Sequence, residues 1–272
     1  HVELACNGLF GRLEHAPEVE RCELAVVDEE AWKLYFDFEV LRELEASASL
    51  DAAFAGHLRS ELNRFCNESD PAILAALYAH HNATRVHETA AIGHAHIDTA
   101  WLWPLAETRR KLVRTFRTQT RYMDEYPEYR FACSQAQQYA WIKEREPDLW
   151  ATIVERVQRG QFVPVGGVWV EPDCNLPSGE SLIRQFVHGQ RFFEDELGAR
   201  CREFWSPDAF GYCGQLPQIM RLCGIDRFLT QKLSWNRFNR PDTHTFVWQG
   251  VDGSEVLGHF PPADTYNSDA SV

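Results

Sequence analysis

The sequence predicts an α/β fold in which parallel strands and helices build a barrel. Short apolar runs alternate with longer amphipathic stretches after residue 88, which is the pattern of successive βαβ units. No Gly-x-Gly-x-x-Gly or Walker sequence follows these runs, so a barrel is favoured over a dinucleotide-binding sheet. A length of 272 residues fits one large α/β domain with an appendage.

The first 87 residues do not follow this alternating pattern. Residues 1–28 are expected to be the end of a preceding β domain, because glycine-containing turns lead into a short alternating run over 22–27. Over 29–87 the apolar residues recur every three to four positions, and Asp70-Pro71 is typical of a helix N-cap and first turn. We therefore expect a helical linker segment over 29–87.

Residues 88–272 are expected to form the N-terminal part of the barrel. Expected strands cover 89–93, 129–133, 162–165, 203–206 and 227–230, and expected helices cover 105–124, 136–158, 179–197 and 215–223. Two more candidate strands, His244–Trp248 and Glu255–His259, are joined at Asp252-Gly253. An Asp-Gly pair between apolar runs is typical of a hairpin, although a loop between sheet strands fits it equally.

Composition restricts the classes of partner. The 27 Lys and Arg residues are outnumbered by 40 Asp and Glu residues, which gives a formal net charge of −13. This charge disfavours nucleic acid and anionic membranes as partners, because both require basic surfaces. No apolar run reaches the roughly 18–20 residues of a membrane-spanning helix. The eight cysteines include no Cys-x-x-Cys pair, so we expect free thiols and a cytoplasmic location.

A dense polar cluster directly follows the first expected strand. Alternation along an extended backbone sends His94, His96 and Asp98 to the same side. In a parallel barrel the active face lies at the C-terminal strand ends, where this cluster falls. Imidazole and carboxylate groups suit Zn²⁺ or a similar divalent ion. Histidines that only hydrogen-bond to strand ends remain the alternative.

The fourth expected strand ends in a second polar segment, 204–211. Pro207 restricts the residue before it to an extended conformation, and Asp208 follows. Asp208 is either a turn cap or a carboxylate at the same barrel mouth, able to bind the metal and attack a substrate. After the third expected strand, Glu171 and Asp173 could face substrate, while a cap of the proline-rich turn is the favoured interpretation of Asp173.

Three separated segments together resemble the zinc-dependent retaining α-mannosidases of glycoside hydrolase family 38. They are His96-Ile97-Asp98-Thr99-Ala100-Trp101, residues 166–180, and Trp205-Ser206-Pro207-Asp208-Ala209-Phe210-Gly211. The second of these, with residues 231–236, looks most like the cytosolic and bacterial branch. The resemblance covers about residues 85–265 and implies an incomplete (β/α)7-type barrel, the N-terminal part of a catalytic domain over 88–272.

The resemblance implies a role for individual residues. His96, Asp98 and Asp208 would bind Zn²⁺, for which Co²⁺ or another divalent ion could substitute, and Asp208 would also be the nucleophile. Substrate-binding positions map onto four residues: Trp101, Lys232, Tyr266 and Asn267. His94 would support the metal ligands without binding the ion.

Two elements of the family pattern have no counterpart in the sequence. The general acid and the fourth zinc ligand lie further along the chain in the family, so we expect both beyond Val272. The expected partners are then mannosides or oligosaccharides and the downstream domains of the same protein, and a homo-oligomer is compatible with the sequence.

Two other functions remain open at this point. A metal-dependent amidohydrolase or deacetylase also carries a His-x-His after its first barrel strand, but it requires further histidine ligands at later strand ends, where only Asp208 is found. A metal-binding or carbohydrate-binding fragment without catalysis is the third hypothesis.

Overall fold

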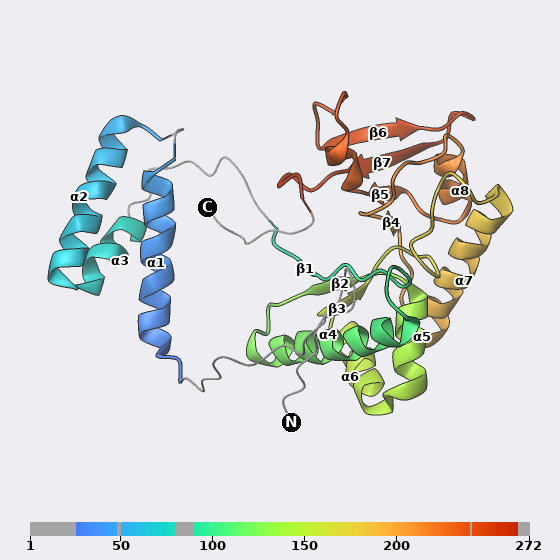
Figure 1. The fold of residues 1–272 in the computed structure, drawn as a ribbon, viewed down its shortest axis with the longest axis horizontal. Helices are drawn as coiled ribbons and strands as arrows, with labels where there is room; N and C mark the ends of the chain where they lie inside the picture. The colour runs from blue at the N-terminus through green and yellow to red at the C-terminus, as the bar shows by residue number, and fades with distance from the viewer. Residues whose placement is uncertain (1–25, 48–49, 80–89, 240, 266–272) are drawn as a thin grey trace, which may run out of the picture. The chain divides into compact units, whose positions relative to one another are not determined.

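A computed structural model describes residues 26–47, 50–79, 90–239 and 241–265 (Figure 1). The described residues fall into two compact units, divided between residues 90 and 91. The expected β tail over 1–28 lies almost entirely outside the described residues. No helix among the described residues is both long and apolar enough to cross a membrane.

The N-terminal unit contains three helices: α1 (Glu29–Glu45), α2 (Ala52–Glu68) and α3 (Pro71–Ala79). Each begins at an aspartate whose carboxylate accepts backbone N–H groups of the first turn, namely Asp28, Asp51 and Asp70. The helices pack around a small leucine core that includes Leu58 and Leu74. Asp70-Pro71 starts a helix, as its sequence indicates.

The larger unit contains two sheets. In the first, β1 (Gly93–His94), β2 (Phe131–Cys133) and β3 (Phe162–Pro164) are parallel and adjacent in that order. In the second, β4 (Glu203–Trp205), β5 (Arg227–Leu229), β7 (Glu255–His259) and β6 (Thr245–Gln249) follow one another across the sheet. All neighbours in the second sheet are parallel except β6 and β7, which form an antiparallel hairpin through the Asp252-Gly253 turn. The α/β class with parallel sheets is confirmed.

Helices connect the parallel strands. They are α4 (Leu105–Glu125), α5 (Ala136–Arg145), α6 (Pro147–Gln158), α7 (Gly179–Leu197) and α8 (Leu216–Leu222), followed by a short 3₁₀-helix over Lys232–Trp235. Figure 1 shows α4, α5 and α6 gathered on one side of the first sheet. The described strands lie in two sheets, so closure into a (β/α)7-type barrel stays a prediction.

The first strand is shorter and later than expected. Among the described residues before it, Ile92 is exposed, and pairing with β2 begins only at Gly93, opposite Phe131. A Cβ atom on Gly93 would lie 2.1 Å from the Tyr129 hydroxyl oxygen, so glycine permits this close approach. Pairing with β2 therefore begins at the last residue of the expected strand and continues one residue past it, to His94.

Each sheet has its own apolar core. Phe131 and Phe162 pack edge to face in the first, together with Phe116 from α4. Phe204 packs against Phe186 from α7 and Phe228 in the second. Because these rings anchor very short strands to the helices, the residues that follow the strands start from fixed positions.

Candidate active site

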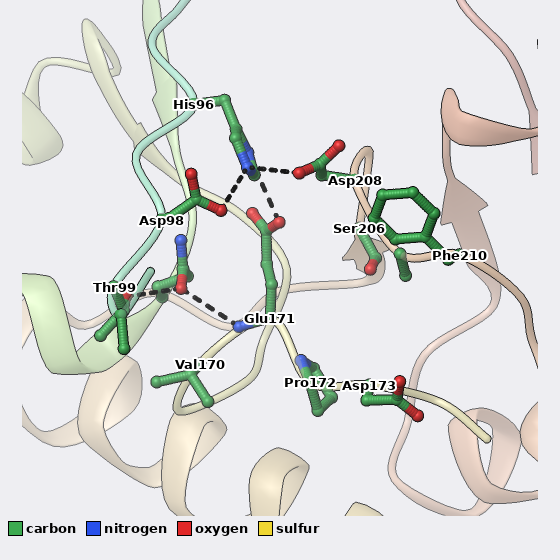
Figure 2. A pocket seen from close by; sticks show the side chains of 13 residues that line it. His96, Asp98, Thr99, Val170, Glu171, Pro172, Asp173, Ser206, Asp208 and Phe210 are labelled. Atoms are coloured by element: carbon green, nitrogen blue, oxygen red, sulfur yellow. Dashed lines mark hydrogen bonds and ion pairs between the residues drawn. The ribbon is translucent and has the colours of Figure 1, made fainter. Parts of the chain in front are cut away.

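Polar side chains that follow β1, β3 and β4 line one cavity of about 320 Å³ at the C-terminal strand ends (Figure 2). His96 and Asp98 come from the segment after β1, Glu171 from the segment after β3, and Asp208 from the segment after β4. The volume lies within the range of about 300–1,000 Å³ that is typical of small-molecule sites.

The segment that carries His96 and Asp98 is irregular and is held by two glutamines. The Gln135 side-chain amide donates to the Ile97 carbonyl at 3.1 Å, and the Gln138 amide donates to the same oxygen at 2.7 Å. The Thr99 hydroxyl donates to Gln135 Oε1 at 2.7 Å. These hydrogen bonds satisfy backbone groups that have no strand partner and fix the direction of both side chains.

Gln135 is itself in an unusual conformation. Its φ of 70° lies in the left-handed region, which costs a residue with a Cβ about 1–2 kcal/mol. In this conformation Gln135 is buried, and its Oε1 also accepts the backbone N–H of Glu171 at 3.2 Å. One side chain thus ties the segment after β1 to the segment after β3.

Asp208 is held from the second sheet. The backbone N–H of Lys232 donates to the Pro207 carbonyl at 3.0 Å, and the Lys232 ammonium forms an ion pair with Asp208 Oδ1. The Lys232 side chain is only 5% exposed, because its Nζ lies 3.4 Å from the Trp235 ring centroid and 4.6 Å from that of Phe210. A buried cation therefore faces the carboxylate.

The ligand atoms of His96, Asp98 and Asp208 all lie within 4.8 Å of one another. His96 Nε2 is 3.6 Å from Asp98 Oδ1 and 3.5 Å from Asp208 Oδ2. In a tetrahedral site with bonds of about 2.0–2.2 Å, neighbouring donor atoms lie about 3.3–3.6 Å apart. One nitrogen and two carboxylate oxygens at this spacing fit a divalent cation such as zinc.

The charges of the cluster affect the histidine. Burial lowers the pKa of His96, but its interaction with Asp98 and the charges of Glu171 and Asp208 outweigh burial and raise that pKa overall. Burial raises the pKa of Glu171 to about 7, although His96 and the Ser134 hydroxyl act in the opposite direction. Three carboxyl groups around one imidazole are an arrangement that a bound cation would stabilise.

The other expected site residues are placed differently. The ring centroid of His94 lies 6.4 Å from that of His96, its Nδ1 is 2.9 Å from the Ala132 carbonyl oxygen, and burial lowers its pKa to about 4. Trp101 is half-exposed and packs edge to face on Trp103 at 5.1 Å, outside the set of residues that lines the cavity. Tyr266 and Asn267 lie outside the described residues. Asp173 caps its turn by accepting the N–H groups of Asn175 and Leu176.

Sequence reasoning missed the residues that follow β2. Ser134 donates to Glu171 Oε1 at 2.5 Å, and Gln135 and Gln138 hold the segment after β1. Their position directly after a parallel strand is the same signal that identified His96. Serine and glutamine at that position do not by themselves predict a site, because neither is a preferred metal ligand or general base.

Comparisons with known proteins agree with these features. The sequence profile of the family described as "Glycosyl hydrolases family 38 N-terminal domain" matches residues 86–272. The chain is 48% identical to Alpha-mannosidase 2C1 of Homo sapiens, over 100% of the chain and 28% of that protein. It is 55% identical to Alpha-mannosidase of Saccharomyces cerevisiae, over 66% of the chain and 17% of that protein. The chain thus spans little more than a quarter of the human relative.

A solved structure resembles part of the chain. The crystal structure of an alpha-mannosidase from Enterococcus faecalis V583 superposes with a TM-score of 0.56 at 22% identity, and the match covers 62% of this chain and 19% of that one. This likeness concerns the fold.

Proposed function

The chain belongs to glycosyl hydrolase family 38, and from this membership we propose that it is part of an α-mannosidase that hydrolyses α-linked mannose with retention of configuration. The observation that carries the proposal is the convergence of His96, Asp98 and Asp208 from two sheets, with their ligand atoms within 4.8 Å of one another. The three residues would hold a divalent cation, for which the donor set favours Zn²⁺. The bound ion would supply Lewis-acid binding of sugar hydroxyl groups.

Asp208 is the proposed nucleophile. One of its oxygens forms a bond to the anomeric carbon while the bond from that carbon to the leaving oxygen breaks. The leaving oxygen takes a proton from a second carboxyl group, which we propose is contributed by the downstream part of the full-length protein. Water then gives a proton to that carboxylate, and its oxygen bonds to the anomeric carbon as the bond from that carbon to the Asp208 oxygen breaks, which releases mannose and the free Asp208 carboxylate.

Lys232 would keep Asp208 ready for attack. Its buried ammonium faces Oδ1, whereas Oδ2 faces His96, so the two oxygens have different partners. The ion pair would hold the Asp208 carboxylate in one orientation for the attack. We propose Trp101, with Tyr266 and Asn267, for contacts to the sugar, and His94 as a support for the segment after β1.

We also propose the wider setting of the site. The two sheets would form the N-terminal part, residues 88–272, of a (β/α)7-type barrel that the downstream chain completes, and residues 29–87 would link it to a preceding β domain. Mannosides or oligosaccharides would be the substrates, in the cytoplasm.

The full-length protein tests this function. We expect it to contain stoichiometric zinc, to hydrolyse an aryl α-mannoside, and to lose activity to a chelator and regain it with Zn²⁺. Asp208→Asn should lower kcat on the order of 10³-fold or more and prevent trapping of a glycosyl-enzyme. A metal-free protein that is fully active and indifferent to chelators would contradict the proposal. A protein that cleaves acetamides and no mannosides would favour a deacetylase.

A further inference from the structure

Glu171 is a buried acid that the proposed reaction does not use. Its side chain is 9% exposed, and its Oε2 lies 3.6 Å from His96 Nδ1. The other ring nitrogen of His96, Nε2, is the one that faces Asp98 and Asp208. Figure 2 shows the Glu171 carboxyl group directed at the His96 ring from the segment after β3. The two nitrogens of one imidazole therefore have separate carboxylate partners.

The surroundings of Glu171 fix the direction of its carboxyl group. The Ser134 hydroxyl donates to Oε1 at 2.5 Å, so the other oxygen is left toward His96. The Glu171 backbone N–H donates to Gln135 Oε1 at 3.2 Å. Ser134 and Gln135 both follow β2, which is paired with β1 and β3 on its two sides. Residues that follow the central strand β2 thus hold Glu171, which comes from the segment after β3 and faces His96 in the segment after β1.

We propose that Glu171 is a positioning residue for the metal ligand His96. Its carboxylate accepts a hydrogen bond from the Nδ1–H group of the imidazole, which leaves the Nε2 lone pair directed at the cation. A histidine ligand whose second nitrogen donates to a carboxylate has a fixed tautomer and ring orientation and is a more basic ligand. This inference rests on the proposed metal function and adds that the third strand contributes to metal affinity without contributing a ligand.

Zinc affinity of the full-length protein tests the inference. Zn²⁺ dissociation constants are measured by competition with a chromophoric chelator for wild type, Glu171→Ala and Glu171→Gln. We expect Glu171→Ala to weaken Zn²⁺ binding about 10–100-fold. The affinity of Glu171→Gln should fall between those of Glu171→Ala and wild type, because the amide oxygen still accepts a hydrogen bond but carries no charge. Glu203→Gln is the matched control, since Glu203 is also a partly buried acid but is the first residue of its strand, and the Zn²⁺ affinity of this variant should equal that of wild type.

A purely structural role for Glu171 predicts a different result. The thermal midpoint of the metal-free Glu171→Ala protein would fall while the Zn²⁺ dissociation constant stayed within twofold of wild type, and this would overturn the proposal. A Glu171→Gln protein with wild-type affinity and strongly reduced kcat would also overturn it, because Glu171 would then act on the substrate. If Glu171→Ala does not fold, Glu171→Gln and Ser134→Ala decide, and both should bind Zn²⁺ more weakly than wild type. A wild-type protein that binds no Zn²⁺ refutes the proposed function itself.

Discussion

The cavity has two walls that are held in different ways. The first-sheet wall, formed by His96, Asp98 and Glu171, is oriented by neutral hydroxyl and amide groups such as the side chain of Gln135. The second-sheet wall carries Asp208, whose carboxylate forms an ion pair with the buried Lys232 ammonium behind the cavity lining. Neutral hydrogen bonds are directional, whereas a charge acts over a wider range of geometry.

This difference separates two tasks within one site. The first-sheet wall sets where the metal ligands point, so its defects should appear in stability and in metal binding. The second-sheet wall sets the charge next to the proposed nucleophile, so its defects should appear in turnover. Substitutions on the two walls of the full-length protein can therefore be compared directly.

The largest effect is expected on the second-sheet wall. Lys232→Met removes the ammonium group that forms an ion pair with Asp208 Oδ1 and keeps most of the side-chain volume. We expect kcat for an aryl α-mannoside to fall about 10²–10³-fold, as is typical when a preorganised electrostatic partner is lost. Steady-state kinetics and a thermal melt of each protein provide the measurement.

Lys232→Arg is the matched control for that variant. It keeps the positive charge in a larger and planar group, so it should retain much more activity than Lys232→Met. If Lys232→Met keeps kcat within fivefold of wild type, the positive charge of Lys232 does not contribute to the reaction at Asp208.

The next effect is expected on the first-sheet wall. Gln135→Ala removes the hydrogen bonds to Thr99, Ile97 and Glu171 and leaves the buried Glu171 N–H without its acceptor. We expect an apparent loss of about 2–3 kcal/mol in the free energy of unfolding. Chemical denaturation of the metal-free protein measures this loss.

Gln135→Gly makes this prediction sharper. Glycine normally destabilises a protein relative to alanine, but at φ 70° it removes about 1 kcal/mol of backbone strain. Gln135→Gly should therefore be more stable than Gln135→Ala. The reverse order would mean that the left-handed conformation of Gln135 contributes no strain.

For the first-sheet wall, the sequence predicts where His96 and Asp98 lie, but it does not predict which side chains hold them in place. Strand alternation places His96 and Asp98 on one side, and the strand-end rule locates the cavity. The importance of Gln135 depends on a left-handed backbone angle that no local pattern indicates for glutamine. The place of Lys232 followed only from resemblance to a family, because a lysine after a strand carries no geometric signal of its own.

In the fold, too, helix ends and turns follow from local sequence, whereas strand pairing depends on residues that are distant in the sequence. Helix α7 begins and ends where its expected residues 179–197 do, since a serine cap and a terminal glycine mark its ends. The hairpin of β6 and β7 is signalled by Asp252-Gly253, but its pairing with β5 through β7 is a tertiary choice. The bounds of β1 were not predictable from its own residues, because they depend on pairing with β2, which lies far away in the sequence.

A smaller effect is expected behind the second-sheet wall. Trp235→Ala removes the ring whose centroid lies 3.4 Å from Lys232 Nζ, and Phe210 remains at 4.6 Å. A cation–π contact contributes about 0.5–2 kcal/mol, so kcat/KM should fall about 2–30-fold. Trp235→Phe keeps an aromatic face and should lie closer to wild type. A loss as large as that of Lys232→Met would show that Trp235 has a role beyond holding the ammonium.

The smallest effect concerns a carboxyl group at the opposite end of the strands. Burial raises the pKa of Glu203, the first residue of β4, although backbone N–H groups and Arg227 partly offset this. A raised folded-state pKa means that the folded protein binds the proton more tightly. The Glu203 contribution to stability is therefore present at pH values below about 4.5 and is lost as the pH rises through the folded-state pKa.

Glu203→Gln mimics the protonated form at every pH. We expect it to be more stable than wild type at pH 7, by less than about 1 kcal/mol, and equal to wild type below pH 4.5, where Glu203 is neutral in both states. Thermal midpoints across this pH range measure the difference. The same substitution at Glu171 should not stabilise the metal-bound protein, because that carboxyl group faces His96 whereas Glu203 faces no metal ligand. If both substitutions raised the thermal midpoint, burial alone would determine the effect of each carboxylate on stability, and the contact of Glu171 with His96 would make no difference.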